Sequence, residues 1–199
     1  MGVSLALKLL ENALASLDSI RSGGGRLLTL GPIIHNPRVT EEYKAQGVLC
    51  VEDPMEVQSG DYVLIRAHGI ARSIEEQLIS RGATVLDATC PRVKDAQLSI
   101  CDMHNKNGGK LLLFGEADHP EVRGLVSYAD GDAIVFADVE ALSNLELVPE
   151  GKYYLASQTT QDKKTFAQVK ARLSHLLKHP FPVLETICGA TKRDRKNVV

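Results

Sequence analysis

The stretch LLLFGEADHPEV, at residues 111–122, joins an apolar run to a glycine and then a histidine. The earlier stretch LLTLGPIIHNPRV, at residues 27–39, has the same order, and in both stretches the histidine (His35 or His119) lies four residues after the glycine. A short apolar run that ends at a glycine is typical of a buried β-strand leading into a loop. The sequence therefore predicts the same strand–loop–histidine unit twice, 84 residues apart.

Other stretches repeat in the same order. DYVLIRAHG at residues 61–69 parallels KYYLASQTT at residues 152–160, and LDATC at residues 86–90 parallels LETIC at residues 184–188. Apolar runs of strand length alternate with segments of helical period along the whole chain, which indicates an α/β protein with mainly parallel sheets. A repeat of about 90–100 residues indicates duplicated α/β lobes, because solenoid repeats have periods of about 20–50 residues.

Each repeated unit runs from one cysteine to the next, which sets the expected domain boundaries. We expect a first α/β lobe over residues 1–90, a second over residues 91–187, and the start of a third over residues 188–199. In this order the opening helix should follow a cysteine, and a third unit should begin after Cys188. We therefore expect the chain to be truncated at both ends.

Several local expectations follow from the same patterns. We expect one amphipathic helix over residues 1–20, a core position for Cys50, and a strand over residues 181–187 that leads to Cys188. Cys101 lies in a helical segment without a partner motif and is expected to be structural. Three histidines on helices or at a helix end are expected to be solvated surface residues: His104, His175 and His179.

The composition argues against several classes of partner. The chain has 199 residues, of which 24% are charged, and its net charge of -2 gives no electrostatic basis for binding nucleic acid or an anionic membrane. Aromatic residues make up 5% and tryptophan is absent, which argues against base stacking. No apolar run approaches the ~20 residues that a membrane-spanning helix needs. We expect neither a nucleic acid nor a membrane as partner.

Polar residues gather where the strands of both repeats end. In α/β sheets, ligands bind beyond the carboxyl ends of the strands. Imidazole, hydroxyl and amide groups, together with loop N–H groups, suit a phosphate or diphosphate. Glu121 can act as a general acid if burial favours its protonated form, and the alternative is a solvated loop carboxylate. The candidate residues at the strand ends are His35, His68, Cys90, His119, Glu121, Gln158, Thr159, Thr160 and Cys188.

Two of the four cysteines occupy equivalent positions in the repeat. Cys90 and Cys188 each end a strand and precede a helix, whose N-terminal amides favour a thiolate. Pro91 follows Cys90, as a proline often follows an iron–sulfur ligand. Either cysteine alone fits a small buried residue at a strand end, but the equivalence favours a shared ligand role. Zinc is less favoured, because no closely spaced cysteine pair is present.

These residues lie in motifs that resemble those of a known family, the IspH/LytB family of 4-hydroxy-3-methylbut-2-enyl diphosphate reductases. The opening MGVSLAL also resembles the family's first motif from just after its cysteine. The motifs occur in family order, as GPIIHNP (31–37), RAHG (66–69), DATCP (87–91), HPEV-x-G (119–124), QTT (158–160) and ICGAT (187–191).

The resemblance implies a three-lobed α/β fold of pseudo-threefold symmetry around a [4Fe-4S] cluster with three cysteine ligands. Two of these ligands correspond to Cys90 and Cys188, and the first family cysteine has no counterpart in the chain. The family's third lobe, with its Ser-x-Asn motif, is also missing. Asp118 stands where the family usually has glycine before His-Pro-Glu.

The resemblance also implies a reaction and its participants. The family removes the hydroxyl group of its substrate reductively and forms isopentenyl and dimethylallyl diphosphate, which are isoprenoid precursors of the non-mevalonate route. Electrons come from a donor such as a ferredoxin or flavodoxin, and the location is cytoplasmic, or plastidic for a plant or algal source. Glu121 would supply protons and Thr159 would orient the substrate. The diphosphate would bind His35, His68 and His119, with Gln158 and Thr160 lining the site.

Because of the missing parts, we expect the chain as it stands to be inactive. The alternative is a cluster-free α/β module that descends from the enzyme and binds a phosphate or diphosphate without turning it over.

Overall fold

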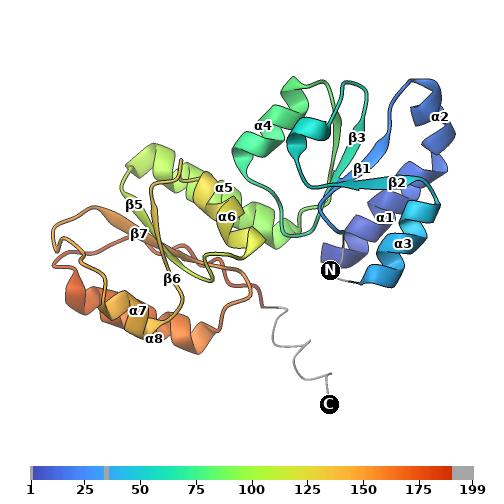
Figure 1. Ribbon diagram of the computed structural model, residues 1–199. Coiled ribbons are helices and arrows are strands. Elements are labelled where there is room, and N and C mark those ends of the chain that lie inside the picture. The colour runs from blue at the N-terminus through green and yellow to red at the C-terminus, as the bar shows by residue number, and fades with distance from the viewer. Residues whose placement is uncertain (1, 34–35, 190–199) are drawn as a thin grey trace, which may run out of the picture. The chain divides into compact units, whose positions relative to one another are not determined.

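A computed structural model describes residues 2–33 and 36–189 (Figure 1). The chain divides into two compact units, with the boundary between Pro91 and Arg92. Each unit contains a parallel β-sheet with helices on both faces. The predicted class, repeated α/β lobes with parallel sheets, is therefore confirmed.

The first unit is built on a four-stranded sheet. The strand order is β2-β1-β3-β4, and every neighbouring pair is parallel. Its elements are α1 (Gly2–Ala15), α2 (Leu17–Ser22), β1 (Leu27–Leu30), α3 (Pro37–Ala45), β2 (Val48–Val51), the short 3₁₀ helix η1 (Pro54–Glu56), β3 (Tyr62–Ile65), α4 (Arg72–Ser80) and β4 (Thr84–Asp87).

The central strand β1 is buried on both faces, which explains its unbroken apolar sequence. Leu27 packs with Leu10 of α1 on one face of the sheet. Leu28 and Leu30 point to the other face and pack with Leu78 of α4. Alternating side chains of one strand thus join two separate cores, because successive residues of a strand point to opposite faces.

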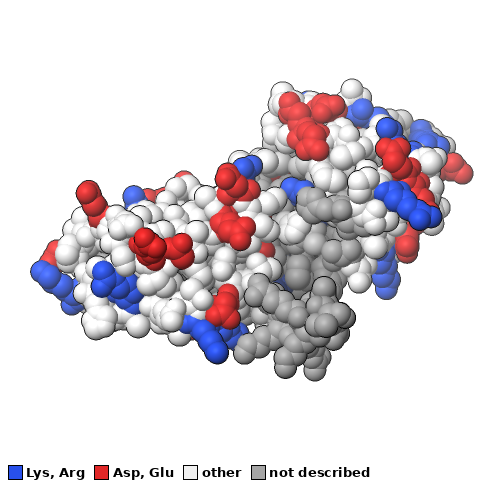
Figure 2. Space-filling model, turned by 60° about the horizontal axis from the view of Figure 1, so that its bottom comes forward, with Lys and Arg blue, Asp and Glu red and all other residues white. Residues whose placement is uncertain are grey.

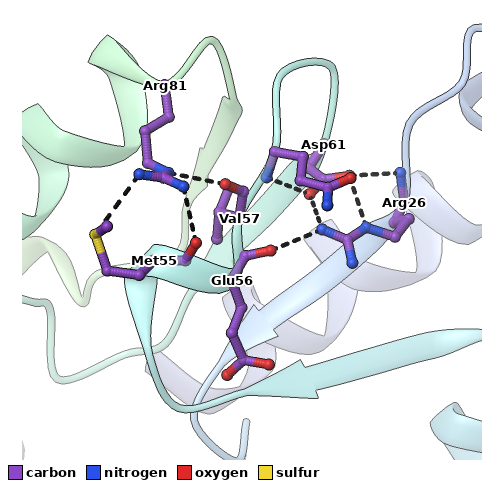
Figure 3. Close-up of polar contacts among 7 residues, drawn as sticks. Arg26, Met55, Glu56, Val57, Asp61 and Arg81 are labelled. Atoms are coloured by element: carbon purple, nitrogen blue, oxygen red, sulfur yellow. Dashed lines mark hydrogen bonds and ion pairs between the residues drawn. The ribbon is translucent and has the colours of Figure 1, made fainter.

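An ion pair closes the amino end of this sheet (Figure 3). Arg26 precedes β1 and Asp61 precedes β3; Nε and Nη2 of Arg26 donate to the two oxygens of Asp61 at 3.1 and 2.6 Å. The backbone amides of Arg26 and Gln58 also donate to this carboxylate, at 3.0 and 2.8 Å. Asp61 is only 1% exposed, and the four hydrogen bonds from Arg26 and Gln58 take the place of water around its carboxylate. The cluster lies at the end of the sheet opposite the predicted ligand edge and is structural.

A second arginine ties α4 to the segment before β3 (Figure 3). Arg81 follows the last residue of α4, and its Nη2 and Nε donate to the carbonyl oxygens of Met55 and Val57, both at 2.8 Å. These bonds satisfy carbonyl groups in and just after the 3₁₀ helix. They fix the connection that lies between β2 and β3 in the sequence.

The second unit has a three-stranded parallel sheet in the order β6-β5-β7. Helices α5 and α6 pack on one face, and α7 and α8 pack on the other (Figure 1). Its elements are α5 (Pro91–Asn107), β5 (Lys110–Phe114), α6 (Pro120–Ser127), β6 (Ala133–Phe136), α7 (Val139–Ser143), β7 (Tyr153–Ser157) and α8 (Lys163–Leu176).

The two sheets share one arrangement. In each, the first strand is central, the second lies at one edge and the third lies on the other side. The glycine that ends the central strand makes the same hydrogen bond in both: Gly31 N donates to Val51 O at 2.8 Å, and Gly115 N donates to Phe136 O at 2.9 Å. The repeat in the sequence is therefore a repeat of strand order and of local hydrogen bonding.

The strand predicted over residues 181–187 is wrong. One isolated bridge, between Leu155 of β7 and Val183, is the only β-pairing of this segment in the described part of the chain. Pro182 lacks a backbone N–H and cannot donate to a ladder. Beyond the bridge, the side chain of Thr186 occupies the position of the next ladder bonds through its contacts with Ser157.

The core position predicted for Cys50 is also wrong, because the residue is exposed. Cys50 lies in β2, which pairs with β1 and is an edge strand of its sheet. Its neighbour Leu49 is 43% exposed as well. An edge strand has fewer neighbours to cover its side chains, and the order of strands is not visible in the local sequence.

Two other expectations need correction. The helix expected over residues 1–20 breaks at Ser16, where α1 ends and α2 begins. His104 and His179 are only partly exposed: His104 Nε2 lies 3.7 Å from Asp130 Oδ2, and the ring of His179 contacts the carbonyl oxygen of Gly151 at 2.9 Å. His175 is exposed, as expected. Cys101 is partly buried and packs against the core under α5.

The face shown in Figure 2 matches the balanced composition. Figure 2 shows acidic and basic side chains interspersed with uncharged ones on the face in view. None of the helices within residues 2–33 and 36–189 combines the length and apolar character needed to cross a bilayer.

Candidate functional site

The candidate site of the second unit lies at the carboxyl ends of β5 and β7. After β5, Gly115 opens a short loop that ends at His119, where α6 begins. After β7, the chain continues into Gln158 and Thr159, which are both buried. Because β5 and β7 are adjacent and parallel, these two loops meet at one edge of the sheet.

Glu121 lies at the carboxyl end of this sheet, between the loops that follow β5 and β7. It lies in the first turn of α6, is 2% exposed, and its Oε1 accepts a 2.6 Å hydrogen bond from the backbone amide of Thr159. A carboxylate in the first turn of a helix also interacts favourably with the helix dipole. The alternative of a solvated loop carboxylate is therefore wrong for Glu121.

His119 is the N-cap of α6. Its Nδ1 accepts a hydrogen bond of 3.1 Å from the amide of Glu121. An amide can only donate, so Nδ1 carries the lone pair and the neutral ring carries its proton on Nε2. In the first unit the cap of α3 is Asn36, whose side chain accepts from Arg38 N. Two residues after the cap, the second unit thus has an acid where the first has an arginine.

Replacing His119 tests this capping role. We expect His119→Ala to lower the free energy of unfolding of the second unit by about 1 kcal/mol, because an N-cap acceptor is lost. His119→Asn is expected to stay within about 0.5 kcal/mol of the wild type, since asparagine is among the best N-cap residues. Urea unfolding followed by amide hydrogen exchange in α6 measures both. Equal losses in the two variants would contradict the capping role.

The side chain of Gln158 is hydrogen-bonded to the loop that leads to His119. Its side chain is buried, and its Oε1 accepts hydrogen bonds from the amide of Glu116 at 3.2 Å and from Gln161 Nε2 at 3.5 Å. Gly115 makes this contact possible, because a Cβ added there would lie 2.9 Å from Val122 Cγ2 and 3.0 Å from Gln158 Cβ. The glycine is thus required by close packing between the two loops.

Gly115→Ala is therefore expected to displace Gln158. We expect the free energy of unfolding of the second unit to fall by about 1–3 kcal/mol, as for other overpacked positions. Faster hydrogen exchange at the amide of Glu116, which loses its acceptor, would show where the damage lies. A control is Gly131→Ala, where no atom lies within 4 Å of the added Cβ but the positive φ is strained for alanine. This variant should lose some stability yet leave the exchange rate at the amide of Glu116 as in the wild type. A loss below about 0.5 kcal/mol in Gly115→Ala would contradict the packing argument.

The two candidate ligand cysteines are bonded through their backbone to equivalent loops, the loop after β3 in the first unit and the loop after β7 in the second. The amide of Cys90 donates to the carbonyl oxygen of Ala67 at 2.9 Å, and that of Cys188 donates to the carbonyl oxygen of Thr159 at 2.7 Å. Neither cysteine is in a disulfide, both residues are partly exposed, and Cys90 directly precedes α5. Partly exposed cysteines at loop ends suit a metal cluster in their chemistry. Within the described residues, however, no group of three potential metal ligands comes together.

The remaining predicted residues are distributed as follows. His68 is partly buried in the loop after β3, on the first unit. Thr160 is exposed beside the buried Thr159. His35 lies outside the described residues. The structure brings together His119, Glu121, Gln158, Thr159 and Cys188 within the second unit.

The sequence interpretation overlooked Thr186 and Ser157, which join the cysteine-bearing segment to β7. A signal was available in the repeat itself. When LDATC is aligned with LETIC, Thr186 replaces Ala88, so a side chain with a hydroxyl stands where the first copy has none.

These features define a duplicated parallel α/β protein with acid, imidazole and thiol groups at the carboxyl ends of its strands. Residues 1–199 match the profile of a family described as LytB protein. The chain belongs to that family.

Curated relatives are similar over nearly the whole chain. A protein from Desulfovibrio desulfuricans named 4-hydroxy-3-methylbut-2-enyl diphosphate reductase is 53% identical over 192 residues, which cover 96% of this chain and 66% of the relative. A protein of the same name from Aquifex aeolicus is 36% identical over 200 residues, covering 99% and 65%. The chain thus spans about two thirds of the length of these relatives.

Solved structures agree with the fold. A structure of (E)-4-hydroxy-3-methyl-but-2-enyl diphosphate reductase, described as the terminal enzyme of the non-mevalonate pathway, is 36% identical with a TM-score of 0.75 and covers 96% of this chain and 66% of its own. A reductase structure from Plasmodium falciparum has a TM-score of 0.83 at 24% identity, covering 98% and 59%, and supports the fold.

Proposed function

We propose that this chain forms part of a 4-hydroxy-3-methylbut-2-enyl diphosphate reductase. The observation that carries the proposal is the buried Glu121, fixed by the Thr159 amide beside His119 and linked through Thr159 to Cys188. Family membership and the names of the relatives support it. Residues 188–199 would begin a third lobe of the complete enzyme, in the cytoplasm.

The reaction is a reductive dehydroxylation. The allylic C–O bond of the substrate breaks, two electrons enter, and two protons are taken up. The products are water and either isopentenyl or dimethylallyl diphosphate. A protein donor such as a ferredoxin or flavodoxin supplies the electrons.

The proposed cofactor is a [4Fe-4S] cluster that Cys90 and Cys188 would help to hold. When bound, such a cluster supplies electron transfer and a Lewis-acidic iron. The two cysteines, neither of which is in a disulfide, are chemically suited to be two of the ligands that such a cluster requires.

Side chains of the protein would bind the diphosphate and supply a proton. His119 presents an N–H at Nε2, which suits an anionic diphosphate oxygen, and His35 and His68 would add further donors. Glu121 would hold its transferable proton on Oε2, because Oε1 accepts the amide of Thr159.

Around this pair, three neighbouring residues complete the site. The hydroxyl of Thr159 would orient the substrate, with Gln158 and Thr160 lining the site. The short bond to the Thr159 backbone keeps the carboxyl group in one orientation.

The alternative function is a cluster-free module that binds a diphosphate without reducing it. The experiment is anaerobic reconstitution with iron and sulfide, both of this chain and of the open reading frame that encodes it. Visible cluster absorption and reduction of the substrate by the product of the reading frame are expected. If that product binds diphosphate but shows neither cluster absorption nor turnover, the alternative holds.

A further inference from the structure

The two cysteine-bearing segments are attached to their sheets in different ways. In the first unit, the parallel ladder between β3 and β4 continues to the pair Ile65–Asp87, and Ala88 N then donates to Ile65 O at 3.0 Å. Main-chain bonds thus position the chain up to two residues before Cys90. No side-chain contact is needed, and the residue at this position is alanine.

In the second unit, main-chain pairing ends earlier. Leu184 N donates to Leu155 O at 2.8 Å, next to the single bridge at Val183. The amide of Thr186 then bonds within its own segment, to Leu184 O at 3.0 Å. From this point to Cys188, Ile187 packs against the core that contains Leu155, but the hydrogen bonds to β7 are made by a side chain.

That side chain is the hydroxyl of Thr186. Its Oγ1 donates to Ser157 O at 2.6 Å and accepts from Ser157 N at 2.9 Å, and it lies 3.1 Å from Ser157 Oγ. One hydroxyl can do both, since it has one donor and two acceptor sites. Ser157 is fully buried, so its backbone groups have no water to replace this partner.

We propose that Thr186 is a positioning residue that sets the place of Cys188, through a hydroxyl clamp on the last residue of β7. The clamp attaches the segment before Cys188 to β7, as the main-chain hydrogen bonds between β3 and β4 attach the segment before Cys90 to β3. Two residues beyond it, the amide of Cys188 bonds to Thr159 O at 2.7 Å, so the clamp also holds Cys188 against the residue whose own amide binds Glu121. That Cys188 is a cluster ligand rests on the proposed function; the clamp itself does not.

The test uses the reactivity of the two thiols in the metal-free chain. Cys50→Ser and Cys101→Ala leave Cys90 and Cys188 as the thiols to be alkylated with iodoacetamide and followed by mass spectrometry. Thr186→Val keeps the shape of the side chain and removes the hydroxyl. We expect it to speed alkylation of Cys188 about tenfold, the factor expected when local opening loses a hydrogen bond, and to leave Cys90 unchanged.

Three matched variants sharpen the result. Thr186→Ser keeps the hydroxyl and should restore slow alkylation of Cys188. Thr186→Ala, which introduces the residue of the first copy, should behave like the valine variant. Ser157→Ala removes one side-chain contact but keeps both backbone bonds to Thr186, and should stay within about twofold of the wild type.

Two outcomes would overturn the proposal. One is an unchanged rate at Cys188 in the valine and alanine variants. The other is an equal acceleration at Cys90 and Cys188, which would show general loosening. Iron bound after reconstitution is measured in a separate experiment. If the wild type binds no iron, the proposed function fails. The proposal for Thr186 depends only on the alkylation rates.

Discussion

Glu121→Gln is expected to lower the turnover of the proposed reductase by about 10²–10⁴-fold, the contribution typical of a positioned general acid. Glutamine keeps an oxygen that accepts the amide of Thr159, but it has no proton to deliver. The fold and substrate binding should therefore change little. Steady-state kinetics of the enzyme from the full reading frame, beside a thermal unfolding curve, measures both effects.

The controls separate proton delivery from positioning. Glu121→Ala should lose turnover to the same degree and also lose stability, because the buried amide of Thr159 is left without its acceptor. Glu116→Gln changes an exposed carboxyl group in the adjacent loop and should leave turnover unchanged. Turnover of Glu121→Gln within a few-fold of the wild type would remove Glu121 as the acid.

Asp61→Asn is expected to lower the free energy of unfolding of the first unit by about 1–3 kcal/mol, because donors around the buried carboxylate lose their acceptor while the partly exposed Arg26 stays in contact with water. The amide cannot accept all four hydrogen bonds that the carboxylate receives from Arg26 and Gln58. Hydrogen exchange along β1 and β3 reports the loss within this unit. Asp18→Asn, an exposed aspartate of the same unit, is the control and should change little.

The same carboxylate gives the first unit a pH dependence. Burial alone would raise the pKa of Asp61, but hydrogen bonds from Arg26 and from the amides of Gln58 and Arg26 outweigh it and lower the pKa below its ordinary value of 3.8. The stabilisation is therefore complete above about pH 4 and is lost as the pH falls through the lowered pKa. The difference in unfolding free energy between wild type and Asp61→Asn should shrink over this acidic range. A constant difference would contradict the ion-pair account.

Much of the fold could be predicted because the sequence contains two copies of the same unit, and each copy supports the assignment of strands and helices in the other. Each apolar run that ends in a glycine or polar loop became a parallel strand, and the two copies agreed on the order of elements. The failures occurred where tertiary context decides. Cys50 has the sequence environment of a core strand, and only its position at a sheet edge exposes it.

The failed strand over residues 181–187 has a similar cause. Its apolar residues and its place before a cysteine suggested a strand, but Pro182 has no backbone donor and the Thr186 hydroxyl replaces main-chain pairing. At the site, the burial of Glu121 was left open by the sequence. The structure settles it: the amide of Glu121 donates to His119 Nδ1, and its carboxylate accepts from the amide of Thr159, which lies in a loop brought close by the adjacent strands.

The boundary between the units falls beside a candidate ligand. Cys90 is followed at once by Pro91, the first residue of α5, and Arg92 already belongs to the second unit. A gene duplication that copies the segment from one cysteine to the next therefore copies a thiol at the junction along with the lobe. Growth of such a protein by whole repeats would add metal-binding capacity and scaffold in a single event, without a separate mutation to create each ligand.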